Sequence, residues 1–201
     1  MKNLDNIFNN SKVLVTGHTG FKGSWLSAWL KKLGARLIGI SDKVHTEPSH
    51  YSQIASIFEK DLRVDIRNLK EFRENIFINE PSFIFHLAAQ PIVLDSYIDP
   101  YKTFTTNSLG TINLLESLKN YQKNCHVVII TSDKVYENLE LSRGYHENDR
   151  LGGYDPYSAS KGAAEIAIRS YFKSFFSKEH NVKLAIARAG NVVGGGDWSK
   201  G

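Results

Sequence analysis

Short hydrophobic runs alternate with longer amphipathic segments along most of the chain. Runs of this length, bounded by glycine or polar residues, are typical of strands that are buried on both faces. Six such strands are predicted, at residues 12–16, 36–41, 61–65, 83–89, 127–130 and 183–187. Helices are predicted after the first strand and over residues 69–77, 100–119 and 157–177.

The regular alternation of strands and helices predicts an α/β fold with a doubly wound parallel sheet, a Rossmann domain. The expected strand order is 3-2-1-4-5-6. No internal repeat, low-complexity linker or shift in composition divides the chain.

Composition and charge narrow the class of protein. The 201 residues are 41% hydrophobic and 23% charged with a net charge of +4, which is ordinary for a soluble globular protein. Lysine and arginine are scattered among acids, so we expect no nucleic-acid partner. We expect no membrane span and no secretion leader, because no apolar run is long enough. Cys125 alone provides neither a disulfide nor a metal cluster, so we expect a cytoplasmic protein without a metal.

A glycine-rich loop follows the first predicted strand. Gly17, Gly20 and Gly23 are spaced three apart, directly before an amphipathic helix. In this context the glycines permit a tight turn and the close approach of a pyrophosphate to the helix start. The alternative is a glycine-rich turn without a ligand. Trp25 and Trp29, one turn apart on the helix, are expected to pack in the core.

Two acids follow the next strands. Asp42, after the second strand, can accept hydrogen bonds from the ribose of NAD and repel the phosphate of NADP, although Lys43 beside it could tolerate that phosphate. We favour NAD. Asp65 and Ile66 end the third strand, where they could meet an adenine edge; equally, Asp65 could cap a turn.

The fourth strand ends in small residues that leave room for a flat cofactor, whereas His86 within it is expected to be a core histidine. Asn107, inside the long helix at 100–119, is either a surface residue or a link to the active site. Ser132, Asp133 and Lys134 follow the fifth strand, at the edge where parallel sheets bind ligands. Burying these groups is costly without a use, although they could begin a solvated loop.

Tyr157 and Lys161 lie one turn apart in a helix that Asp155 and Pro156 are suited to begin. An ammonium beside a phenol lowers the pKa of the phenol, so this pair could act as a base near neutral pH. The alternative is an ordinary helix surface.

Together these motifs resemble the extended short-chain dehydrogenase/reductase family of NAD-dependent epimerases and dehydratases. The resemblance is greatest to its CDP-glucose 4,6-dehydratases. The matching runs are residues 17–26, 86–91, 131–138, 152–158, 188–191 and 194–198. Asp133 and Lys134 are the most specific match, because related dTDP-glucose dehydratases have Asp-Glu there and epimerases have neither charge.

The resemblance implies dehydration of CDP-glucose to CDP-4-keto-6-deoxyglucose with NAD as cofactor. Its implied catalytic residues are Ser132, Asp133, Lys134, Tyr157 and Lys161. Its implied cofactor contacts are Gly17, Gly20, Phe21, Lys22, Gly23, Asp42, Asp65, Ile66, Leu87, Ala88, Ala89, Asn107, Tyr157 and Lys161. Its implied contacts with the nucleotide-sugar substrate are Gln90, Ser132 and Asn191.

The resemblance also implies a homodimer, formed through the two helices at 100–119 and 157–177. Leu94 and Asp95 depart from the family, which often has basic residues there. Family members continue for more than a hundred residues beyond this chain, so residues 1–190 are expected to form the NAD-binding domain and 191–201 to begin a substrate domain that is largely missing. Two alternatives stay open: another nucleotide-sugar dehydratase or epimerase, and a truncated NAD-binding protein without catalysis.

Overall fold

The computed structural model describes residues 6–176 and 179–199. The strands are β1 (Lys12–Thr16), β2 (Arg36–Ser41), β3 (Phe58–Arg63), β4 (Phe83–His86), β5 (Cys125–Ile130) and β6 (Val182–Ala187). The α-helices of this part of the chain are α1 (Phe21–Lys32), α2 (His50–Ile54), α3 (Leu69–Asn79), α4 (Val93–Ile98), α5 (Pro100–Phe104), α6 (Gly110–Leu118) and α7 (Pro156–Ser174).

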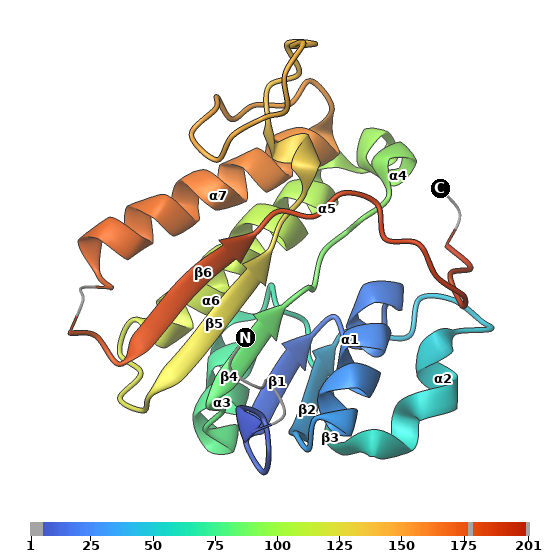
Figure 1. The fold of residues 1–201 in the computed structure, drawn as a ribbon, viewed down its shortest axis with the longest axis vertical. Coiled ribbons are helices and arrows are strands. Elements are labelled where there is room, and N and C mark those ends of the chain that lie inside the picture. The colour runs from blue at the N-terminus through green and yellow to red at the C-terminus, as the bar shows by residue number, and fades with distance from the viewer. Residues whose placement is uncertain (1–5, 177–178, 200–201) are drawn as a thin grey trace.

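The six strands form one parallel sheet in the order β3-β2-β1-β4-β5-β6, which confirms the predicted fold and strand order. At its centre, Thr16 of β1 pairs with Ile40 of β2 and His86 of β4. The winding reverses between β1 and β4, so the carboxyl ends of these strands flank the crevice where such sheets bind ligands (Figure 1).

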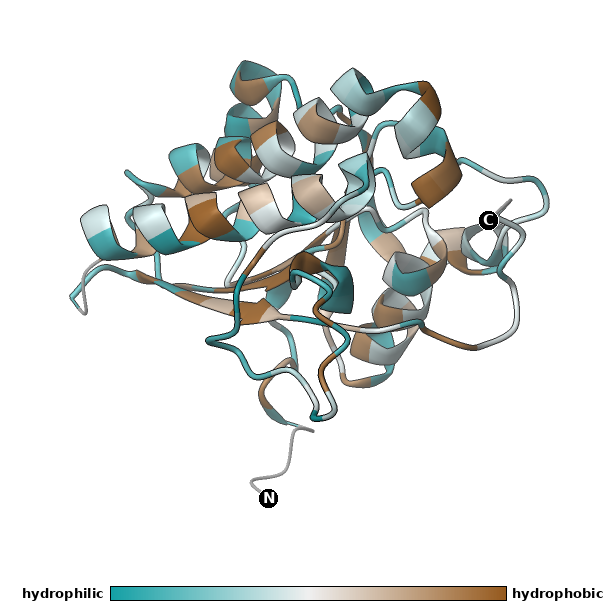
Figure 2. Cartoon of the chain, turned by 90° about the horizontal axis from the view of Figure 1, so that it is seen from above, coloured by the Kyte–Doolittle hydropathy of each residue, from teal (hydrophilic) through white to brown (hydrophobic). Residues whose placement is uncertain are grey.

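Helices cover both faces of the sheet (Figure 1). Along β1, Val13 and Val15 pack in one core with Leu30 of α1, whereas Leu14 packs in a second core with Phe72 of α3. The second core also includes residues of α6 and α7. The strands are dominated by hydrophobic residues and the helices mix both kinds, as expected for strands between two helical layers (Figure 2).

Four strands differ from the predicted bounds: β5 begins two residues earlier, at Cys125, β6 begins one residue earlier, at Val182, and β3 and β4 differ more. β3 lies at Phe58–Arg63 rather than 61–65, because it is an edge strand with mostly exposed side chains and no continuous hydrophobic run. β4 ends at His86 rather than at 89. Beyond it, the Thr16 hydroxyl accepts hydrogen bonds from the backbone N–H groups of Leu87 and Ala88, both at 3.2 Å.

The predicted long helix at 100–119 contains a π-helical turn, Thr105–Leu109, between α5 and α6. Such turns are rare and occur often at functional sites. Asn107 lies in this turn and is buried. The end of α7 at Ser174 precedes the predicted end at residue 177, which lies outside the described residues.

The expectation that Trp25 and Trp29 pack in the core is wrong, because they are 47% and 58% exposed. The buried face of α1 consists instead of Gly23, Ser24, Ser27 and Leu30. These mostly small residues let the helix lie close to the sheet and the glycine loop, and the indoles point away from the core. Within the described chain, no helix has both the length and the apolar character needed to cross a bilayer.

Candidate active site

The glycine loop between β1 and α1 has no room for side chains at two of its glycines. A Cβ at Gly17, where φ is +72°, would lie 2.7 Å from the backbone nitrogen of Ala88, and a Cβ at Gly23 would lie 2.2 Å from the Gly17 carbonyl oxygen. α1 then begins at Phe21 with no side-chain cap and no acid in its first turn. This helix start can therefore receive an anionic group, as the sequence predicted.

Two lysines meet near this loop. The pKa of Lys161 is lowered to about 8, mainly by burial and to a smaller extent by the positive charge of Lys22. Burial also lowers the pKa of Lys22, against the opposing effect of the Asp133 carboxylate. Lys22 and Lys161, which are far apart in the sequence, thus form a positive region close to Asp133, which follows β5.

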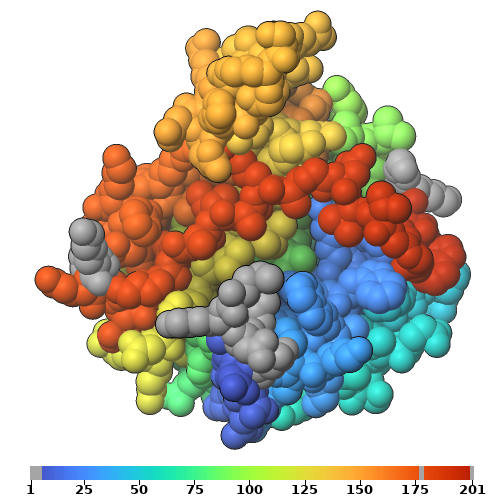
Figure 3. Space-filling model, viewed as in Figure 1, coloured from blue at the N-terminus to red at the C-terminus, as the bar shows by residue number. Residues whose placement is uncertain are grey.

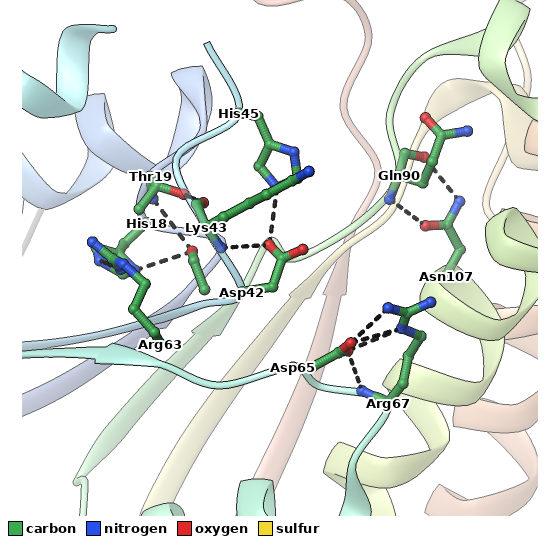
Figure 4. A network of polar contacts seen from close by, with 11 residues as sticks. His18, Thr19, Asp42, Lys43, His45, Arg63, Asp65, Arg67, Gln90 and Asn107 are labelled. Atoms are coloured by element: carbon green, nitrogen blue, oxygen red, sulfur yellow. Dashed lines mark hydrogen bonds and ion pairs between the residues drawn. The ribbon is translucent and has the colours of Figure 1, made fainter. Parts of the chain in front are cut away.

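The two acids expected near the adenosine lie side by side beyond β2 and β3 (Figure 4). Asp42 accepts hydrogen bonds from Nε2 of His45 at 2.9 Å and from the Lys43 backbone at 2.8 Å. The bond from His45 is the main reason that the pKa of Asp42 is lowered. Asp42 is therefore a preformed acceptor at the place expected for the ribose.

Asp65 forms a turn with Arg67. It accepts from the Arg67 backbone at 2.9 Å and from the guanidinium at 2.6 Å, and this pairing lowers its pKa. The structure thus has the turn that was the alternative to an adenine contact. Ile66 is only 5% exposed and packs in the core against Gly110, and its carbonyl accepts a hydrogen bond from Asn113.

Asn107 links the chain after β4 to α7. Its side chain accepts from the Gln90 backbone N–H at 2.8 Å and donates to the Gln90 carbonyl at 3.1 Å (Figure 4). It also donates to the Ser160 hydroxyl at 2.9 Å. Ser160 directly precedes Lys161. Of the two predicted roles for Asn107, the structure has the link to the active site. The amide of Gln90 bonds to Thr103 and to the Ile92 backbone, which fixes its orientation.

The turn after β5, residues 132–134, which we call the catalytic turn after the role predicted for it, brings together Ser132, Asp133 and Lys134. The Ser132 hydroxyl donates to Asp133 at 3.0 Å and accepts from the Lys134 backbone at 3.2 Å. Ser132 also lies close enough to the Tyr157 phenol to lower the pKa of that phenol. Ser132 is buried, whereas Asp133 and Lys134 are exposed. The hydroxyl thus sits between a carboxylate and a phenol at the carboxyl edge of the sheet.

Tyr157 and Lys161 lie in the first turns of α7, which begins as predicted. Asp155 caps the helix by accepting from Ser158 at 2.9 Å, and Pro156 follows it. The pKa of Tyr157 differs from the expectation: burial raises it, and only the nearby Ser132 hydroxyl opposes this. Lys161 lies on the same helix but does not produce the expected lowering of the tyrosine pKa.

His86 is a core histidine, as predicted. Its Nδ1 hydrogen-bonds Thr16 at 2.8 Å, and burial lowers its pKa to about 3. A neutral, fully enclosed imidazole is suited to holding β1 and β4 together. Asn191 lies in the exposed segment after β6.

A polar cluster beside the loop, with His18 and Tyr51 buried and Asp61 and Arg63 exposed, was not found from the sequence. His18 lies 2.8 Å from Asp61, which also pairs with Arg63 at 2.6 Å and accepts from Tyr51. A Cβ at Gly39 would lie 2.4 Å from the His18 ring. A glycine inside the second predicted strand was the available signal, since it often marks a close approach.

The residues present fit a dinucleotide such as NAD. The loop has room only for backbone at its two tightest glycines, the start of α1 is uncapped, and Asp42 is an available acceptor after the neighbouring strand β2. The described residues hold no cluster of three metal-ligating side chains.

The chain resembles known proteins along most of its length. A family model described as GDP-mannose 4,6 dehydratase matches residues 14–187. A CDP-glucose 4,6-dehydratase of Salmonella typhimurium is 46% identical over 201 residues, which is 97% of this chain and 56% of that protein. A dTDP-D-glucose 4,6-dehydratase of Dictyostelium discoideum is 33% identical over 208 residues, 96% of this chain and 46% of that protein. The chain spans about half the length of these curated relatives.

Solved structures share the fold. Pal from Bacillus thuringiensis matches with a TM-score of 0.77 and 27% identity, over 88% of this chain and 55% of that chain. A UDP-glucuronic acid 4-epimerase from Bacillus cereus, in complex with UDP-glucuronic acid and NAD, matches with a TM-score of 0.72 and 27% identity over 88% and 55%. The expected relation to nucleotide-sugar dehydratases and epimerases is confirmed, and the chain belongs to the GDP-mannose 4,6 dehydratase family.

Proposed function

We propose that this chain is the cofactor-binding part of an NAD-dependent CDP-glucose 4,6-dehydratase. The observation that carries the proposal is the Ser132 hydroxyl, which donates a hydrogen bond to Asp133 and lies close enough to the Tyr157 phenol to affect its pKa, at the crevice of the sheet. A serine–tyrosine pair suits the oxidation of an alcohol, and an adjacent acid suits the loss of water. The 46% identity to a CDP-glucose dehydratase supports CDP-glucose as the substrate.

In the first step the sugar is oxidised at C4. NAD, when bound, accepts a hydride from C4 and later returns it to C6. Tyr157 takes the proton from O4, Ser132 hydrogen-bonds the same oxygen, and Lys161 holds the ribose. Because burial raises the pKa of free Tyr157, the proposal requires Lys161 and the positive charge of the bound cofactor to lower it in the complex.

In the second step water is lost across C5 and C6. The 4-keto group makes the C5 proton acidic, Lys134 assists its removal, and Asp133 protonates the leaving C6 hydroxyl. Hydride return to C6 and proton return to C5 give CDP-4-keto-6-deoxyglucose. The exposure of both Asp133 and Lys134 is consistent with groups that meet a substrate.

The test uses Tyr157→Phe in the protein at its natural length. The variant should bind NADH nearly as the wild type does, because the ring and its packing remain. Its turnover of CDP-glucose, followed as the appearance of a product lighter by one water, should fall by about 10²–10⁴-fold. Tyr154→Phe is the matched control, since Tyr154 is 85% exposed just before α7. Turnover retained in Tyr157→Phe would contradict the assignment of the base.

An epimerase is the second candidate, because the family includes relatives such as a CDP-paratose 2-epimerase of Salmonella typhi at 31% identity. The carboxylate and ammonium at residues 133 and 134 favour the dehydratase, since epimerisation requires no acid to expel water. A product of unchanged mass would favour the epimerase. NADH binding without turnover of any nucleotide sugar would favour the non-catalytic alternative.

We further propose a cytoplasmic homodimer whose domain at residues 1–190 binds NAD and whose residues from 191 begin the substrate domain. The dimer is supported by apolar side chains that protrude from α5 and α7. Tyr101, Phe104 and Ile166 are 80%, 38% and 61% exposed. Burying such side chains against a second copy would be favourable. A monomeric mass in solution would contradict the dimer.

A further inference from the structure

The segment after β6, residues 188–198, crosses the carboxyl edge of the sheet and reaches α1 and α2 (Figures 1 and 3). We call it the post-β6 segment. It is attached to the catalytic turn at its near end, where the backbone N–H of Asp133 donates to the Ala189 carbonyl at 3.1 Å. Its far end reaches the helix that follows the glycine loop.

Two aromatic residues hold the far end. Nε1 of Trp25 donates to the Gly195 carbonyl at 2.9 Å. The indole stacks on the His50 ring, with 4.2 Å between centroids and 11° between planes. His50 is itself fixed to α1 by a 2.8 Å hydrogen bond between its Nδ1 and the Ser24 hydroxyl. We call Trp25 and His50 the latch.

The post-β6 segment contains three consecutive glycines, Gly194, Gly195 and Gly196, which differ in the space around them. A Cβ at Gly194 would lie 3.3 Å from the Phe21 ring. A Cβ at Gly196 would lie 2.9 Å from the His50 Cβ, and its φ of +87° also disfavours any other residue. A Cβ at Gly195 would meet no atom within 4 Å. The close fit at Gly194 places the segment against Phe21 in the first turn of α1, where the cofactor pyrophosphate is expected, and the close fit at Gly196 places it against α2.

We propose that Trp25 and His50 hold the post-β6 segment closed over the dinucleotide site and thereby slow the release of the cofactor. They are positioning residues, because they act through the segment. This inference rests on the proposed function. In that reaction the hydride returns to the same sugar, so no cofactor has to leave between turnovers. A closed site therefore retains the cofactor without limiting the rate.

The experiment measures the dissociation rate of NADH from the full-length protein by stopped-flow displacement with excess NAD. Trp25→Phe keeps an aromatic ring but removes the N–H, so NADH should dissociate about threefold to tenfold faster. Gly196→Ala should also accelerate release, whereas the control Gly195→Ala should leave the rate within about twofold of the wild type. Turnover at saturating NAD should be unchanged in Trp25→Phe, while the concentration of NAD needed for half-maximal turnover should rise.

The outcomes separate this inference from the function on which it rests. A wild type that binds no NADH would refute the proposed function. A wild type that binds NADH, with dissociation rates unchanged in both Trp25→Phe and Gly196→Ala, would refute the latch alone. Equal acceleration by Gly195→Ala and Gly196→Ala would also refute it. If Gly196→Ala does not fold, the NADH dissociation rate of Trp25→Phe alone tests the latch. A loss of kcat at saturating NAD in Trp25→Phe would contradict the latch, because it would show that the substitution damages the fold.

Discussion

The ion pair between Glu165 of α7 and Arg188 after β6 offers a sharp test of what stabilises the site. The Glu165 side chain is fully buried and that of Arg188 is 13% exposed. Two hydrogen bonds of 2.8 and 2.5 Å join them, and Glu165 also accepts from Thr131 at 2.7 Å. The bonds to Glu165 are the main reason that the pKa of Arg188 is raised. Thr131 directly precedes the catalytic turn, so the ion pair helps to hold that turn in position through Thr131.

Arg188→Met should destabilise the fold strongly. The variant would leave the Glu165 carboxylate at zero exposure, with the Thr131 hydroxyl and Arg169, 3.9 Å away, as its remaining polar neighbours among those described. Removing one partner of a buried pair costs about 3–5 kcal/mol. Glu165→Gln should cost less, about 1–3 kcal/mol, because the Arg188 guanidinium also bonds the Glu147 carbonyl and stacks 4.5 Å from the Tyr136 ring.

Urea unfolding of the wild type, the two single variants and the double variant gives the coupling between the residues. The double variant should lose at least about 1 kcal/mol less than the sum of the singles, because it leaves no unpaired charge. Arg143→Met is the control, since its bidentate pair with Asp149 lies at the surface. The reasoning fails if Arg188→Met is no more damaging than Arg143→Met, or if the single effects add.

Three further changes test the site. Gly23→Ala would place its methyl group too close to the Gly17 carbonyl oxygen and should abolish NADH binding. The control Gly144→Ala, whose methyl group would meet no atom within 4 Å, should bind NADH normally. Titration of NADH fluorescence measures the binding of both variants. Asp42→Asn should reduce the preference for NADH over NADPH by about tenfold or more, and an unchanged ratio would contradict the ribose role. The pKa of Lys161 is lowered from 10.5 to about 8 by folding. Between these two pH values, the unfolded state therefore keeps the Lys161 proton and the folded state has lost it. The wild type should therefore gain unfolding free energy relative to Lys161→Met between pH 8 and 10.5; parallel stability curves would contradict this.

The sequence alone was enough for the features that depend on near neighbours. Buried strands appear as hydrophobic runs because both faces of a parallel sheet are covered. Asp155 and Pro156 predicted the start of α7, because a cap and a first-turn proline act within one turn. The strand order followed from the alternation of elements and the handedness of their connections.

Only the tertiary structure decided the features that depend on long-range packing. The edge strand β3 carries exposed charges and no hydrophobic run, so its position was predicted too late in the chain. Trp25 was assigned to the core, but its partners are His50 and a carbonyl 170 residues away. The pKa of Tyr157 was expected to fall through Lys161, yet burial raises it. Spacing along a helix fixes which residues share a face, whereas desolvation and distant contacts depend on what the rest of the chain places against that face.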